Sequence, residues 1–295
     1  MSAVGEGSKY AFLASRECRT GELVLHYEEG PNSGPPLILM HGLGRDCHDF
    51  SILFPALSRQ WHLYAVDLRG HGKSGRVPRG YLSNGYASDI TTLLKSAVGC
   101  PAILFGHSLG GVTALRVAAE EPALVRALIL GDSALTASSF PGSLYPALFE
   151  MLLKVRLSSS SVEQMAKGLA QSRIPLPGID ELIAIGDLPG HDEAYLLKWA
   201  ACLQQVDPEA LQMTLDGSTW KDFDGEALMK RIVCPTLLLQ ANPDLGGLMS
   251  DSEVHRAMQL LAKPKLQKFP LLGHALHLQQ AQPVLNAVTS FLQEC

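Results

Sequence analysis

One serine of this chain stands in a pattern that could make it a nucleophile. Residues 106–110 read Gly-His-Ser-Leu-Gly and follow the apolar run at 102–105. A small-x-Ser-x-small pentapeptide between a buried strand and a helix bends the chain sharply, strains the serine backbone and presents its hydroxyl to a ligand. Glycine-sized neighbours tolerate that crowding. We therefore predict that Ser108 is a nucleophile; the alternative is an ordinary glycine-rich turn.

A serine hydroxyl attacks only after a base has taken its proton, so it needs a histidine, with a carboxylate behind that histidine. His274 follows Gly273 and the apolar segment 269–272, and a helical pattern over 280–292 comes next. It should therefore lie on a loop beside the end of a strand. We predict that His274 is the base, although a lone histidine is more often a structural residue.

Two aspartates at strand ends could orient His274. Asp244 follows the apolar segment 237–239, and Asp132 follows the segment 128–130 and Gly131. We prefer Asp244, which gives the chain order Ser, Asp, His that is typical of nucleophile-elbow enzymes. Asp132 remains the alternative acid.

Short apolar segments predict the strands that position these residues. They lie at 23–25, 37–40, 63–66, 103–105, 128–130 and 237–239. Apolar residues at consecutive positions are typical of strands covered on both faces, and helical patterns over 85–98, 110–121 and 252–261 lie between them. The alternation predicts an α/β fold, a three-layer αβα sandwich with a mostly parallel sheet of about eight strands.

The alternation breaks between 134 and 231, where leucine-rich helical patterns and the loop signal Ile-Pro-Leu-Pro-Gly at 174–178 occur. We predict a core domain formed by 1–133 and 232–295, and a helical lid formed by 134–231. Because the insertion falls between two strands of the sheet, it should cover the carboxyl ends of the strands, where open sheets bind ligands. A second domain unrelated to the site is the alternative.

Composition excludes several classes of partner. The chain has 295 residues, 46% of them hydrophobic, and a net charge of −5, so it has no basic excess for nucleic acid or an anionic membrane. Residues 1–10 show no targeting pattern, and no apolar run approaches the ~18 residues of a membrane span. The six cysteines are scattered, as expected for free thiols. We expect a cytoplasmic protein with no membrane anchor and a small-molecule substrate.

The motifs in this order resemble the α/β-hydrolase family, in its serine-nucleophile branch with a helical lid. The resemblance covers nearly the whole chain, through His-Gly-Leu-Gly at 41–44, Asp-Leu-Arg-Gly-His-Gly-Lys-Ser at 67–74, the Ser108 elbow, Asp244 and Gly273-His274. It implies a triad of Ser108, Asp244 and His274, and an oxyanion hole formed by the backbone N–H groups of Leu43 and Leu109.

The chain departs from the family at one point. Members commonly have Gly-x-x-Asp where residues 241–244 read Ala-Asn-Pro-Asp, and in part of the family the acid lies on the strand that carries Asp132. The proline narrows the backbone options just before Asp244.

We predict a serine hydrolase that cleaves a small, largely apolar carboxylic ester through an acyl-enzyme, with no cofactor. The same triad serves lactonases, amidases and carbon–carbon bond hydrolases, and a non-catalytic small-molecule receptor could keep the fold; pocket shape decides among them. Between 150 and 231 there are 13 acidic and 8 basic residues, which indicates no cationic clamp in the lid for an anionic substrate.

Two further patterns suggest other ligands but fail on context. Residues 70–75 match Gly-x-Gly-x-x-Gly, yet loop-like sequence follows where a dinucleotide fingerprint should open a helix. His274 and His277, with His41 and His48 elsewhere, lack a carboxylate at ligand spacing, so we predict no metal. His277 should pack at the start of the last helix.

Overall fold

The computed structural model describes residues 10–295 except 22, 141–142 and 177. Residues 1–9, where the sequence shows no targeting pattern, lie outside the described residues. Within the described ranges, none of the helices has the length and apolar character that crossing a membrane requires.

Eight strands form the central sheet, in the spatial order β1-β2-β4-β3-β5-β6-β9-β10. They are β1 (Ala14–Arg19), β2 (Val24–Glu29), β3 (Pro36–Met40), β4 (His62–Val66), β5 (Ala102–His107), β6 (Val125–Gly131), β9 (Thr236–Ala241) and β10 (Pro264–Phe269). The β1–β2 and β2–β4 pairs are antiparallel, and the other pairs are parallel. The predicted α/β class and mostly parallel sheet are confirmed.

Side chains alternate between two buried faces of the sheet, which makes the fold a three-layer sandwich. In β3, Leu37 and Leu39 pack into one apolar cluster, and Ile38 and Met40 pack into the other. Helices α2 (Ser83–Leu93), α3 (Leu109–Glu120) and α9 (Asp251–Leu260) cover one face; α1 (Phe54–Leu57) and α11 (Ala281–Gln293) cover the other. Each fully buried leucine or isoleucine contributes about 1.5–3 kcal/mol, so the consecutive apolar residues hold both layers.

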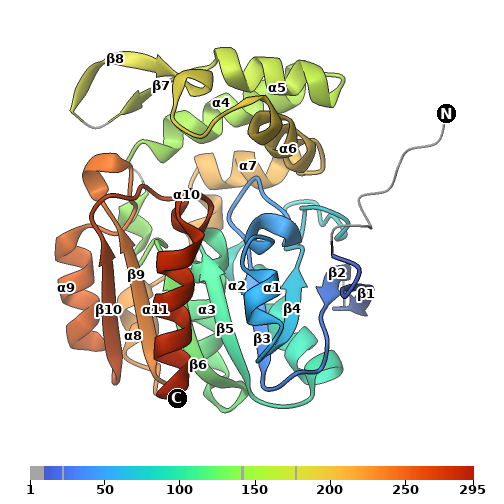
Figure 1. Ribbon diagram of the computed structural model, residues 1–295, viewed down its shortest axis with the longest axis vertical. Coiled ribbons are helices and arrows are strands. Elements are labelled where there is room, and N and C mark those ends of the chain that lie inside the picture. Colours follow the sequence, from blue (N-terminus) through green and yellow to red (C-terminus); the bar gives the residue numbers. More distant parts are fainter. Residues whose placement is uncertain (1–9, 22, 141–142, 177) are drawn as a thin grey trace.

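A largely helical segment, which comes between β6 and β9 in the sequence, lies over one end of this sandwich (Figure 1). It contains α4 (Tyr145–Ser158), α5 (Val162–Gln171), the hairpin of β7 (Arg173–Leu176) and β8 (Ile179–Ala184), α6 (Glu193–Gln204) and α7 (Pro208–Leu215). We call residues 145–215 the cap. The hairpin stands where the sequence indicated only a loop. Helix α8 (Gly225–Met229), inside the predicted insertion, packs against α3 and α9 instead.

Aspartates begin two of the cap helices and one of them also fastens the cap to the core. Asp192 accepts a hydrogen bond from the backbone N–H of Tyr195 at 2.8 Å and so caps α6. Asp207 caps α7, its own N–H donates to the carbonyl of Gly70 at 2.7 Å, and its carboxylate accepts from the Tyr81 hydroxyl at 2.5 Å. The loop after β4 is thereby held under the cap.

Candidate active site

Ser108 stands at a strained turn between β5 and α3. Its backbone has φ 53° and ψ −119°, a conformation that residues other than glycine rarely adopt. The turn is tight because a Cβ at Gly106 would collide with the carbonyl of Gly110, and a Cβ at Gly110 would collide with the carbonyl of Met40. Backbone strain of this kind costs about 1–3 kcal/mol. The half-buried hydroxyl of Ser108 faces the cavities described below.

His274 pairs with Asp132 at the carboxyl ends of the strands, where Asp132 follows β6 and His274 lies on the loop after β10. His274 Nδ1 donates to Asp132 Oδ2 at 2.7 Å, and the Asp132 side chain is fully buried. The carboxylate also accepts backbone N–H bonds from Leu248 at 2.7 Å and from Ala241 and Met249 at 3.3 Å each. These donors satisfy a buried charge that would otherwise be costly. They also fix the orientation of the imidazole, whose Nε2 is left for a second partner.

The preference for Asp244 as the partner of His274 needs correction. Asp244 lies in a short 3-10 turn, Pro243–Leu245, and is exposed at the rim of the large cavity. Asn242 caps that turn by accepting from the N–H of Asp244 at 2.9 Å, and among the described residues the Asp244 carboxylate makes no hydrogen bond to His274. The same loop then returns its amides at 248 and 249 to Asp132. Chain order could not discriminate, because Asp132 also falls between Ser108 and His274.

Two side chains that the sequence analysis did not identify hold His274 in place. The Tyr145 ring lies 4.8 Å from the His274 ring, centroid to centroid, and its hydroxyl donates to the carbonyl of Gly246 at 2.7 Å. His107 Nε2 donates to the carbonyl of His274 at 2.9 Å. Burial, together with His274 and His277, holds the pKa of His107 well below its usual value, so His107 is neutral. Pro146 after Tyr145 marks a helix start, but nothing in the sequence places that helix over His274.

The loop at 41–45 brings backbone donors close to Ser108. A Cβ at Gly42 would lie 3.1 Å from the Ser108 Cβ, so the loop touches the serine. The N–H groups of Leu43 and Leu109 donate to no acceptor among the described residues. Leu109 begins α3, where the first N–H groups have no partner within the helix and the dipole is positive. Two unused donors therefore flank the serine.

The glycine-rich segment at 67–75 supports that loop. His71 Nε2 accepts from the N–H of Gly44 at 3.3 Å, and its Nδ1 donates to the carbonyl of Arg69 at 2.9 Å. Asp67 accepts from the N–H groups of Cys47 at 2.7 Å and Lys73 at 2.9 Å. Burial, with neighbouring His41, lowers the pKa of His71 to about 3. The segment is a buried structural network.

Three buried residues beside the nucleophile could in principle hold a cation. Ligand atoms of Asp49, His107 and His277 lie within 4.8 Å of one another. His277 lies in α10 (Leu276–Gln279), just before the last helix. Its Nε2 donates to Asp49 Oδ2 at 3.1 Å, and its ring stacks on that of Phe50. His107 Nδ1 lies 3.9 Å from Asp49 Oδ2 and is a buried atom with no hydrogen-bond partner among the described residues. The hydrogen bond between His277 and Asp49 packs α10 against the segment that carries Asp49.

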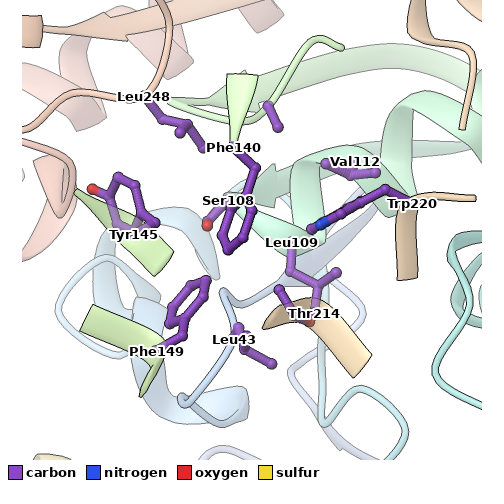
Figure 2. Close-up of a pocket in the computed structure, with 11 residues that line it drawn as sticks. Leu43, Ser108, Leu109, Val112, Phe140, Tyr145, Phe149, Thr214, Trp220 and Leu248 are labelled. Carbon is purple, nitrogen blue, oxygen red and sulfur yellow. The ribbon is translucent and has the colours of Figure 1, made fainter. Parts of the chain in front are cut away.

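Ser108 opens onto two cavities that share Leu43, Tyr145 and Phe149. The first has a volume of about 20 Å³, room for one group the size of water or methyl, and Figure 2 shows its apolar lining. The rest of its wall is formed by Leu109, Val112, Ala134, Phe140, Thr214, Trp220 and Leu248. The second has a volume of about 750 Å³, lies between the core and the cap, and reaches both His274 and Arg45. The site thus offers one small compartment and one large one.

A model of the alpha/beta hydrolase family matches residues 37–287. The chain belongs to the α/β-hydrolase family. The predicted resemblance to this family is confirmed. The 2-(acetamidomethylene)succinate hydrolase of Mesorhizobium japonicum is 38% identical over 118 residues, which are 40% of this chain and 42% of that relative. The chain thus spans less than half the length of that relative.

A second relative is matched over most of its length. The pimeloyl-[acyl-carrier protein] methyl ester esterase of Neisseria meningitidis serogroup B is 31% identical over 253 residues, 83% of this chain and 90% of the relative. Among solved structures, E-2-(acetamidomethylene)succinate hydrolase aligns with a TM-score of 0.75 and 24% identity over 95% of this chain and 99% of that structure's chain. The enol-lactonase of Burkholderia xenovorans aligns with a TM-score of 0.73 and 19% identity, covering 94% and 100%. The structural likenesses show the shared fold.

Proposed function

We propose that this hydrolase cleaves a carboxylic ester through an acyl-enzyme on Ser108, with His274 as base and Asp132 as the acid that orients it. The observation that carries the proposal is the 2.7 Å bond between His274 and a fully buried Asp132, with a serine in a strained turn lining the same cavity as His274. The acid here replaces Asp244. No cofactor or metal takes part in the proposed steps.

The proposed reaction uses Ser108, His274, Asp132 and two backbone N–H groups in a fixed order. His274 Nε2 takes the proton of Ser108 Oγ as the oxygen attacks the carbonyl carbon, and Asp132 stabilises the imidazolium. The N–H groups of Leu43 and Leu109 receive the carbonyl oxygen as it gains negative charge, each such donor contributing about 3–4 kcal/mol to lowering the barrier. His274 then protonates the leaving alcohol. Water, activated by His274, attacks the acyl group, releases the acid and restores Ser108.

The two cavities support an ester with one small side. The compartment of about 20 Å³ accommodates a methyl-sized group, and the compartment of about 750 Å³ accommodates the remainder. One relative is named a methyl ester esterase, which agrees with a small alcohol. The cap covers the large compartment and, in this proposal, acts as the lid.

Hydrolysis of an ester panel tests the proposal. We expect turnover of methyl esters of medium-chain acids by the native enzyme, and its loss in Ser108→Ala with an unchanged circular-dichroism spectrum. Ser160→Ala, at an exposed position of the cap, should retain full activity. Undiminished turnover in Ser108→Ala would overturn the mechanism, while preferential cleavage of lactones, amides or β-diketones would reassign the bond. Tight binding of these compounds with no turnover would favour a receptor.

A further inference from the structure

An arginine of the core faces the large cavity. Arg45 lies two residues after Leu43, and its guanidinium carbon sits over two rings of cap helix α6, 4.8 Å from the centroid of Trp199 and 5.4 Å from that of Tyr195. Arg45 Nη2 donates to the Tyr195 hydroxyl at 2.6 Å. The same side chain lines the cavity that reaches Ser108. A cation therefore stands in the wall of the site although the cap sequence indicates none.

The guanidinium keeps its charge and has an unused edge. Arg45 Nε lies 3.9 Å from Asp49 Oδ1, which is an ion pair beyond hydrogen-bond distance, and Asp49 is itself bonded to His277. The side chain of Arg45 is 16% exposed and that of Asp49 is 3% exposed, and both residues line the cavity. Burial acts to lower the pKa of Arg45, but Tyr195 and Asp49 raise it above its usual value.

Nη1 of Arg45 donates to no acceptor among the described residues. It is also not fully buried, because the fully buried polar atoms without a partner do not include it. It is therefore accessible from the cavity. A guanidinium whose face is covered by aromatic rings presents its edge, and that edge matches the two oxygens of a carboxylate.

The apolar lining of the rest of the cavity strengthens the interaction that Arg45 can make with an anion. Arg45 is the one lysine or arginine among the described residues that line it. The cap side of the wall is mostly apolar, with the aromatic rings of Tyr145, Phe149, Tyr195 and Trp199 beside an aliphatic part formed by Leu148, Leu152, Ile174, Ile185 and Leu188. A hydrogen bond to a charged group is stronger in such low-dielectric surroundings than in water. An apolar chain that ends in a negative charge fits this wall and this cation.

We propose that Arg45 binds a carboxylate of the substrate, so that the preferred substrates are half-esters of aliphatic dicarboxylic acids. This inference rests on the proposed ester hydrolysis at Ser108. The ester end lies at Ser108, the methylene chain lies along the aliphatic wall, and the free carboxylate meets the edge of the guanidinium. The reaction is unchanged: water cleaves the ester bond, and the products are an alcohol and a dicarboxylic acid.

Matched substrates and variants test the role of Arg45. Methyl hexanoate and monomethyl adipate have equal chain length and differ in whether a methyl group or a carboxylate ends the chain. We expect the native enzyme to favour monomethyl adipate, and Arg45→Gln to lower its kcat/KM by about 10- to 100-fold, mostly through KM. The kcat/KM for methyl hexanoate should change by less than about threefold. Arg45→Lys, which keeps the charge and loses the planar fork, should be intermediate.

Two control variants separate carboxylate binding from a merely structural contact. Arg156→Gln removes another cap-bound arginine, whose Nε donates to the Val206 carbonyl at 3.1 Å away from the cavity lining, and should leave the preference unchanged. Tyr195→Phe removes the hydroxyl bond to Arg45 and keeps the ring. If Arg45 only fastens the core to the cap, Arg45→Gln and Tyr195→Phe will slow both substrates equally. That result, or a native enzyme without preference for monomethyl adipate, overturns the inference and leaves ester hydrolysis standing.

A binding measurement keeps the two proposals distinguishable. In Ser108→Ala, adipate should raise the Tm in a concentration-dependent way, and the added Arg45→Gln change should abolish the rise. A rise that survives loss of Arg45, or no rise at all, overturns the carboxylate site. Failure of the native enzyme to hydrolyse any ester while adipate binding still depends on Arg45 would instead contradict the proposed function.

Discussion

Replacing Asp132 by asparagine should remove nearly all activity, while the same change at Asp244 should remove none. Asp132 Oδ2 accepts from His274 Nδ1 and the N–H of Leu248, both at 2.7 Å, and Oδ1 accepts from two backbone N–H groups at 3.3 Å. Every lone-pair direction of the carboxylate thus faces a donor. An amide in its place must turn its NH₂ group toward donors in either orientation.

The magnitude follows from what each orientation loses. With NH₂ toward the ring, His274 must take the tautomer that carries its proton on Nε2, and it cannot accept the proton of Ser108. With NH₂ on the other side, the negative charge that stabilises the imidazolium is still gone. A comparable triad loses about 10⁴ in kcat from this substitution, which is about 5.5 kcal/mol of barrier. The unpaired donors should also lower the free energy of unfolding by about 1–3 kcal/mol.

Steady-state kinetics on a methyl ester and urea denaturation of each variant provide the assay. Asp244 is exposed, and its carboxylate makes no hydrogen bond among the described residues, so Asp244→Asn should change the free energy of unfolding by less than about 0.5 kcal/mol. The reasoning is refuted if Asp132→Asn keeps more than a tenth of native kcat, or if Asp244→Asn causes the larger loss.

Three further predictions concern the elbow, the oxyanion loop and acid stability. Ser108→Gly should be more stable to urea than Ser108→Ala by about 1 kcal/mol, because glycine tolerates φ 53° without strain; equal stabilities would show that the turn is unstrained. Gly42→Ala should lower kcat by about 10- to 100-fold in a folded enzyme, because its Cβ would lie 3.1 Å from the Ser108 Cβ and shift the loop; native kcat would contradict this. The neutral form of His71 is favoured by folding, so unfolded chains bind the extra proton between the ordinary pKa of about 6.5 and the folded pKa of about 3. The free energy of unfolding should therefore fall as pH falls through that window, and His71→Gln should lose part of this slope; an unchanged slope would refute the assignment.

The parts of this molecule that are local in sequence could be predicted, and the parts that depend on loop packing could not. Buried parallel strands are recognisable as apolar runs, and the elbow at Ser108 needs only five residues. Strand β1 escaped detection because it is an edge strand with exposed polar side chains such as Arg16 and Glu17. Its consecutive polar residues, Ser15 to Glu17, carry no buried-strand signal.

The acid and the cation show why the site was harder to predict than the fold. Asp132 and Asp244 each follow a strand. Which of them pairs with His274 depends on the backbone conformation of the loop at 242–249, and the residue types do not predict that conformation. The charges of the insertion do not predict the role of Arg45, because this cation belongs to the core and directly follows the His-Gly-Leu-Gly motif. A side chain on one segment can complete a cavity formed by another.

Labelling with a fluorophosphonate tests the central assignment most directly, because the reagent reacts with an activated serine hydroxyl and leaves a covalent adduct. Mass spectrometry of the intact protein and of its peptides should find a single adduct on Ser108 in the native enzyme, none in Ser108→Ala, and much slower labelling in Asp132→Asn. An adduct on a different residue, or labelling of Ser108→Ala at the native rate, would contradict the account.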